Sequence, residues 1–135
     1  MFTENYRVEF TAFAQSHYVK TFEKKHKSNW QVTRRALVAQ LSRIDTVIES
    51  SRAEIIKREG VSWLVKMNFS VAVINKSPSG SGNRLIVYVN HELKTTKVLL
   101  VYSKNEISSP NETAKWQAVI KDQYPGEWMA VHPSF

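Results

Sequence analysis

Residues 80–107, which read GSGNRLIVYVNHELKTTKVLLVYSKNEI, decide the fold. They contain two apolar runs, Leu85–Val89 and Val98–Tyr102, which are β-branched or aromatic and apolar at odd and even positions alike. This pattern predicts two neighbouring strands, each covered on both faces, in the middle of a small sheet. The short polar connection between the runs predicts that the strands are antiparallel.

One end of this hairpin carries fixed positive charge. In an antiparallel pair the start of the first strand lies beside the end of the second, so Arg84 and Lys104 are expected at the same edge of the sheet. A Ser/Gly-rich stretch precedes Arg84, and Lys76 lies upstream of it. Cations held on a rigid scaffold suit a site that binds or cleaves phosphate. The alternative is two solvated charges at strand ends, and the spacing alone favours neither.

Length and composition indicate one compact domain with a polyanionic partner. The 135 residues are 42% hydrophobic, enough for a single core. Nineteen Lys and Arg against twelve Asp and Glu give a net charge of +7, which favours nucleic acid as the partner over a merely soluble basic surface. No apolar run approaches the roughly 18 residues of a membrane span, and the start of the chain does not resemble a signal peptide. The absence of cysteine excludes disulfides and thiol catalysis.

The residues before residue 50 predict a strand followed by two helices. Residues 6–10 alternate apolar and charged side chains, as a half-exposed strand does, and Thr11 is placed to cap the next element. Apolar residues then recur every four positions in a first helix. Ser28 and Gln31 have the spacing of a capping box for a second helix, whose apolar stripe is Leu37, Leu41, Ile44 and Ile48. We expect these helices to form a hairpin on one face of the sheet.

Residues 53–73 predict one further strand. Residues 53–59 are ambiguous between a helical turn and a short strand. Apolar residues then occupy every odd position from Val61 to Val73, which is the clearest period-2 pattern in the chain. Lys66 and Asn68 share its polar face. If that face is open, Lys66 points toward the same basin as Arg84.

The C-terminal part predicts a third helix and an apolar tail. Ser109-Pro110-Asn111-Glu112 has the composition of a helix start. The stripe of Trp116, Ile120 and Tyr124 follows, and we expect the helix to end before Pro125. Residues 125–135 are too apolar for a disordered tail, so they are expected to pack on the domain or on a partner.

The catalytic residue types exclude several chemistries. The four histidines lack metal-ligand spacing, the acidic residues form no metal-binding set, and there is no GxSxG motif. Lys, Arg, Asn, Glu and Tyr remain. Such residues can cleave RNA without a metal or cofactor, because the RNA 2′-hydroxyl attacks its own phosphate and the protein needs only to orient it, move protons and stabilise charge. DNA lacks that hydroxyl, so a site of this kind is selective for RNA.

The hairpin motifs resemble the RelE/ParE toxin superfamily, in particular its HigB-like branch. Residues 81–88, SGNRLIVY, resemble the family's "G-x-R-v-i-y" strand, and residues 102–106, YSKNE, resemble the "YxKNE" ending of HigB-type members. The basic first helix, Trp30 and Trp116 are also similar, and the resemblance spans roughly residues 6–124. It implies a RelE-like α+β fold: a small antiparallel sheet, mixed at the N-terminal strand, with a helical hairpin on one face and a C-terminal helix.

The resemblance also implies roles for individual residues. Arg84 matches the family arginine that contacts the scissile phosphate, and Lys104 matches the basic residue at the end of the last strand. Family members often carry a lysine just before the glycines, where this chain has Ser79, with Lys76 three positions earlier. The expected catalytic residues are Arg84, Lys104, Lys76 and Glu106. The expected RNA contacts are Lys66, Asn83, Asn105 and Ser81.

The function implied is that of a type II toxin, a ribosome-dependent endoribonuclease that cleaves translated mRNA. Its expected partners are a cognate antitoxin, of the helix-turn-helix DNA-binding kind, together with the ribosome and mRNA. It is expected to need no cofactor and no membrane and to act in the cytoplasm as a single domain, with its core at about residues 6–124. Two alternatives stay open: a non-enzymatic relative that binds a protein target such as gyrase, and an inactive relative.

Overall fold

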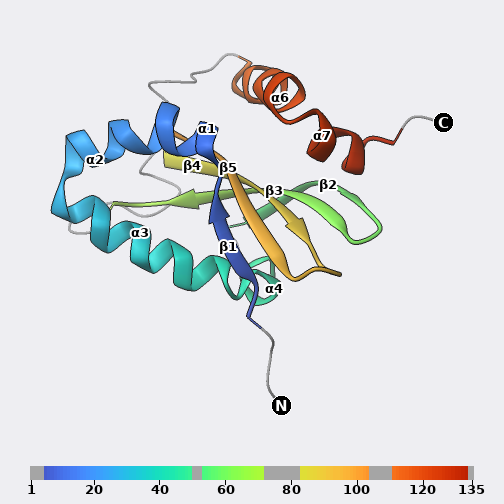
Figure 1. The fold of residues 1–135 in the computed structure, drawn as a ribbon, viewed down its shortest axis with the longest axis horizontal. Helices are drawn as coiled ribbons and strands as arrows, with labels where there is room; N and C mark the ends of the chain where they lie inside the picture. The colour runs from blue at the N-terminus through green and yellow to red at the C-terminus, as the bar shows by residue number, and fades with distance from the viewer. Residues whose placement is uncertain (1–4, 50–52, 72–82, 104–110, 134–135) are drawn as a thin grey trace.

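The computed structural model describes residues 5–49, 53–71, 83–103 and 111–133. A five-stranded sheet lies at its centre, with the strand order β1-β5-β4-β3-β2 (Figure 1). The strands are β1 (Arg7–Phe10), β2 (Ala53–Glu59), β3 (Ser62–Phe69), β4 (Asn83–Asn90) and β5 (Thr95–Ser103). Only the β1–β5 pair is parallel, and the other three pairs are antiparallel. The predicted mixed α+β sheet is therefore confirmed.

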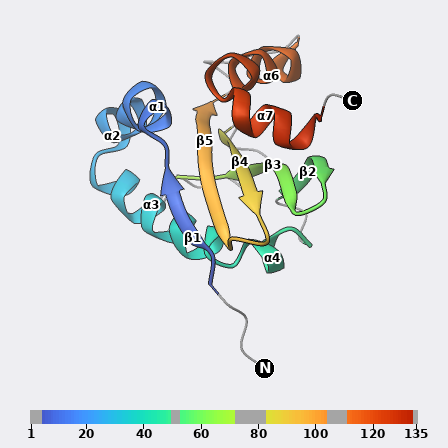
Figure 2. The same ribbon diagram turned by 45° about the vertical axis from the view of Figure 1, so that its right-hand side comes forward.

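Helices cover both faces of this sheet. The N-terminal helical region comprises α1 (Ala12–Ala14), the π-helical turn η1 (Gln15–Val19), α2 (Lys20–His26), α3 (Ser28–Leu41) and α4 (Ile44–Val47). The C-terminal helices are α6 (Glu112–Gln123) and α7 (Pro125–Val131). Figures 1 and 2 show the N-terminal helices and the C-terminal pair on opposite sides of the strands. The predicted helical hairpin on one face is confirmed.

The two faces of the sheet form two hydrophobic clusters. The first joins Trp30, Leu37 and Leu41 of α3 to the odd-numbered residues of β3. The second joins Trp116 and Ile120 of α6 to β3, β4 and β5. Residues 84–89 of β4 are all buried, because side chains on both sides of this strand are covered. The prediction of two central strands covered on both faces is confirmed.

The ambiguous segment 53–59 is a strand. It pairs antiparallel with β3, with a register irregularity between Ile55 and Lys57. β3 itself ends at Phe69, earlier than its sequence pattern predicted. Its polar face is not open, since α7 contacts β2 and β3 and α6 packs beside it.

Two predictions about helix boundaries are corrected. The capping box at Ser28 is wrong, because Ser28 lies inside α3 and the residue before it, Lys27, takes the N-cap position with φ 52° and no side-chain cap. The second helix does not continue to Ile48, because α3 ends at Leu41 and a separate short helix, α4, begins after residues 42–43. Residues 125–131 form a further helix, and the full burial of Val131 in the second hydrophobic cluster confirms that this segment packs on the domain. The Thr11 cap is confirmed, since its hydroxyl accepts from the Ala14 N–H at 3.1 Å.

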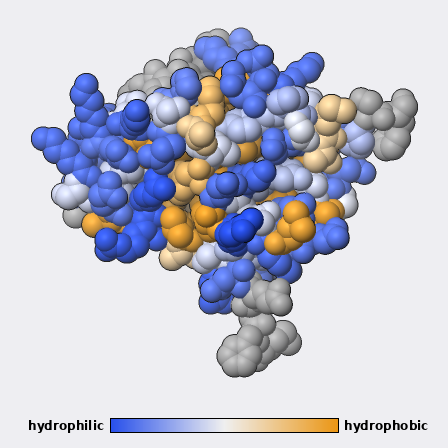
Figure 3. All heavy atoms as spheres, in the orientation of Figure 1, coloured by the Kyte–Doolittle hydropathy of each residue, from blue (hydrophilic) through white to orange (hydrophobic). Residues whose placement is uncertain are grey.

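The outer surface is mainly polar. Figure 3 shows apolar side chains emerging between polar ones in several separate places. Among the described residues, the large exposed apolar side chains are Val32, Val38, Val61, Leu93 and Met129. No helix in the described ranges is long and apolar enough to span a bilayer.

We expect Leu41→Ala to lower the free energy of unfolding by about 2–5 kcal/mol, because Leu41 is fully buried between α3 and the sheet and its loss leaves a cavity. Val32→Ala on the exposed side of the same helix is the control, with an expected change within about 0.5 kcal/mol. Urea denaturation of both variants measures the difference. Equal losses would contradict the assignment of the inner face of α3.

Candidate active site

Arg84 lies near the first residue of the central strand β4, beside the end of β5. Its cross-strand neighbours are Tyr102 in β5 and Asn68 in β3. The guanidinium Nη1 donates to the carbonyl of Asn83 at 3.1 Å, and the residue is only 7% exposed. A cation so deeply placed needs compensating partners, since burying an unpaired charge is costly. Within the described ranges no carboxylate oxygen forms an ion pair with it.

Three side chains meet beside Arg84 on the same face of the sheet. The Tyr102 hydroxyl donates to Glu112 Oε2 at 2.7 Å. Lys66 Nζ lies 3.6 Å from the same oxygen, and the two side chains of this ion pair are 20% and 16% exposed. We refer to Lys66, Arg84, Tyr102 and Glu112 as the Arg84 cluster. It holds two cations, one carboxylate and one phenol on three strands and a helix.

The surroundings keep Tyr102 protonated. Burial is the main cause that raises the pKa of this phenol far above its ordinary value, and the hydrogen bond and charge of Glu112 raise it further. The positive charge of Arg84 acts in the opposite direction. Tyr102 is therefore a hydrogen-bond donor in this cluster rather than a base.

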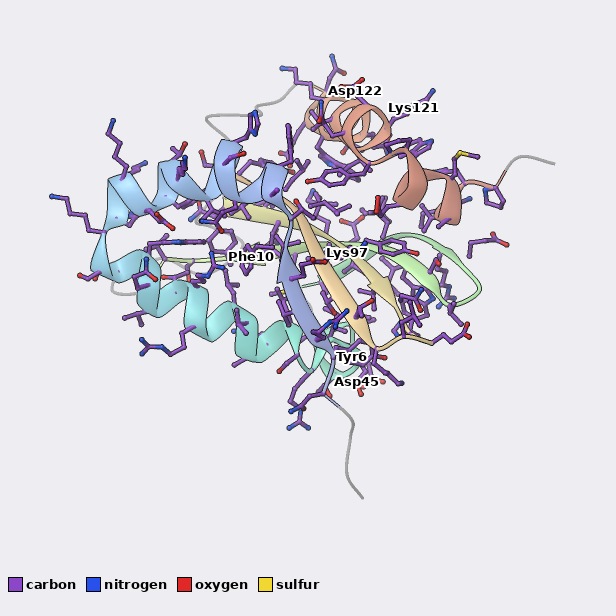
Figure 4. The ribbon with its side chains drawn as sticks, in the orientation of Figure 1. Tyr6, Phe10, Asp45, Lys97, Lys121 and Asp122 are labelled. Atoms are coloured by element: carbon purple, nitrogen blue, oxygen red, sulfur yellow. The ribbon has the colours of Figure 1, made fainter. Side chains whose placement is uncertain are left out.

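The position of Glu112 follows from the periodicity of α6. Residues 112, 116 and 120 recur every four positions, so they share one face of the helix. Trp116 and Ile120 are fully buried on that face, which directs Glu112 to the strands as well. By contrast, Lys121 and Asp122 are exposed on the outer side of α6 (Figure 4). A carboxylate in the first turn of a helix is also favoured by the helix dipole.

The structure describes three of the residues that the sequence suggested for the site. Arg84 and Lys66 both lie beside Glu112 and Tyr102, and Asn83 lies at the start of β4 opposite Ser103. The other five, Lys104, Lys76, Glu106, Asn105 and Ser81, fall outside the described residues. The sequence analysis missed Tyr102 and Glu112 as members of the site. For Glu112 the signal was available, because it extends the apolar stripe of α6 by one turn.

A second polar group lies at the other end of β4. The Tyr6 hydroxyl and His91 Nδ1 form a hydrogen bond of 2.7 Å, which connects the residue before β1 to the turn between β4 and β5. Burial and then Lys94 lower the pKa of His91, while Asp45 opposes this shift. Figure 4 shows Tyr6 and Asp45 near α4, away from α6. No three His, Asp or Glu side chains in the described part of the chain are grouped to hold a metal ion.

Comparison with known proteins places the fold. No family model matches the chain, and no curated protein matches it. Among solved structures, it is similar to a chain of the archaeal RelE–RelB complex from Pyrococcus horikoshii. The TM-score is 0.54 at 17% sequence identity, and the match covers 74% of this chain and 96% of that one. The chain has a RelE-like fold.

We expect Tyr102→Phe to lower the free energy of unfolding at neutral pH by about 1.5–3 kcal/mol, because the Glu112 carboxylate loses a charge-assisted hydrogen bond. The difference between the parent and Tyr102→Phe should shrink as the pH rises. The folded state raises the pKa of Tyr102, so its stabilisation is complete below the unfolded pKa of about 10. Above that pH it is lost at about 1.4 kcal/mol per pH unit.

Chemical denaturation of both proteins between neutral and alkaline pH measures this difference. Tyr88→Phe is the control, since Tyr88 lies on the same face of the sheet as Tyr102 but bonds to Ser62 rather than to a carboxylate. A parent–Tyr102→Phe difference that stays constant across alkaline pH would contradict the described environment of Tyr102.

Proposed function

We propose that this protein is a ribosome-dependent endoribonuclease toxin of the RelE type, with motifs that resemble those of the HigB-like branch. The observation that carries the proposal is Arg84, a nearly buried arginine fixed on a central strand beside Lys66 and Tyr102. The RelE-like fold and the hairpin motifs at residues 81–88 and 102–106 support it. The net charge of +7 suits an RNA substrate.

The chemistry needs no group beyond the chain's own residues. The 2′-hydroxyl of the RNA attacks the adjacent phosphorus, and the bond to the 5′-oxygen breaks. Arg84 binds the phosphate and stabilises the charge that builds up on its oxygens, which a planar guanidinium does through paired hydrogen bonds. Lys104 and Lys76 take part in proton transfer or charge stabilisation, and Glu106 is a positioning group. Lys66, Asn83, Asn105 and Ser81 position the RNA strand.

The partners follow from the same proposal. The similar structure is a RelE–RelB complex, and a cognate antitoxin is proposed for this chain by analogy with it. The ribosome presents single-stranded mRNA in a fixed path and so supplies part of the substrate positioning. We propose that the protein acts in the cytoplasm, where translated mRNA is available.

We expect Arg84→Gln to reduce mRNA cleavage by about 10²–10³-fold, since it removes a charged donor to the transition state. Primer extension on a translated message after induction, and cleavage on programmed ribosomes, measure the effect. Arg35→Gln is the matched control, because Arg35 is an exposed arginine on α3. Cells that express the parent or Arg35→Gln should stop growing with codon-phased cuts, and cells that express Arg84→Gln should grow.

Three other outcomes would overturn the proposal. Arrest with intact messages in both the parent and Arg84→Gln would indicate a protein that inhibits a target by binding. Cleavage that is equal in both would remove Arg84 from the mechanism. Absence of arrest with folded parent protein would indicate an inactive relative.

A further inference from the structure

The Glu112 carboxylate occupies a place suited to an anionic ligand. It accepts a hydrogen bond from the Tyr102 hydroxyl at 2.7 Å and lies 3.6 Å from the Lys66 ammonium, and the positive charge of Arg84 acts on the same Tyr102 hydroxyl. A phosphodiester presents the same features to these donors, namely one negative charge and oxygen atoms that accept hydrogen bonds. Two groups of the Arg84 cluster that an RNA phosphate would meet, the Lys66 ammonium and the Tyr102 hydroxyl, are therefore already engaged by an anion of the chain itself.

We propose that Glu112 is a built-in competitor of the RNA phosphate, which restrains the Arg84 cluster until RNA displaces its side chain. This inference deepens the proposed function and rests on it, because it concerns the regulation of the same site. The Glu112 carboxylate and the RNA phosphate compete here for Lys66 and Tyr102, and the two negative groups repel each other. RNA binding therefore has to overcome both the existing contacts of Glu112 and its charge.

The way in which α6 packs determines what can move. Trp116 and Ile120 are fully buried and hold the helix on the sheet, so the displacement involves the Glu112 side chain rather than the whole helix. The Glu112 side chain is still 16% exposed and stands in the first turn of α6. A carboxylate at this position can turn toward solvent while the apolar stripe behind it stays packed.

The test measures binding of a single-stranded RNA of about ten nucleotides with 2′-O-methyl groups, which prevent cleavage. Glu112→Gln keeps an acceptor for Tyr102 and removes the charge, so we expect it to tighten RNA binding by about three- to tenfold. Glu112→Ala, which also removes the acceptor, should tighten binding as well. Thermal unfolding of each variant checks that the protein is folded.

The matched control is Glu127→Gln. Glu127 in α7 pairs with Lys97 at 3.7 Å, and its side chain is 22% exposed, so it resembles Glu112 in charge, exposure and partner but lies outside the Arg84 cluster. It should change RNA affinity by less than about twofold. A gain equal to that of Glu112→Gln would show a general charge effect and overturn the inference.

A double variant distinguishes failure of this inference from failure of the proposed function. Arg84→Gln is combined with Glu112→Gln, and the gain from Glu112→Gln should vanish in the double variant. If Arg84→Gln has no effect on RNA binding in either background, the proposed site itself is wrong. If Arg84→Gln weakens binding but Glu112→Gln leaves it unchanged or weakens it, the proposed site stands and Glu112 is not a competitor.

Discussion

The pairing of β4 with β5 is the constraint on which the rest of the structure depends. Residues 84–89 and 98–102 are buried on both sides of the sheet. A pair of strands that is apolar on both faces requires two separate layers of cover. The chain meets this requirement by placing helices before and after the strands. The N-terminal helices cover one face, and α6 with α7 cover the other.

The pairing of β4 with β5 also places the charged side chain of Arg84 next to the second hydrophobic cluster. Arg84 is the first buried residue of β4, and it lies opposite the last buried residue of β5, Tyr102. Together with Lys66 it forms a positive region at the margin of the second hydrophobic cluster. Glu112 of α6 pairs with Lys66, so one helix both completes a hydrophobic core and places a negative charge beside the two cations.

The sequence predicts the parts of this fold that depend on periodicity. The central strands, the stripe of α3 and the stripe of α6 were found because their burial repeats at regular spacing. β2 remained ambiguous because its outer residues, such as Lys57 and Arg58, are exposed at a sheet edge and an irregularity interrupts its alternation. The start of α3 is not predictable from the sequence, because Lys27 adopts a positive φ, which a lysine rarely does. The positions of Arg84 and Lys66 were predictable from strand geometry, but the approach of Glu112 depends on how α6 docks.

The parallel pairing of β1 with β5 has a consequence for the order in which the protein folds. The Arg7 N–H donates to the carbonyl of Lys94 at 2.8 Å, and Arg7 lies opposite Thr95 in β5. β1 comes first in the chain order of the described strands, and its neighbour in the described sheet, β5, comes last. Contacts between residues so distant in sequence form slowly, and they cannot form during synthesis before the second residue has left the ribosome. The sheet is therefore completed only after β5 has left the ribosome. Until then β1 lacks the strand with which it pairs.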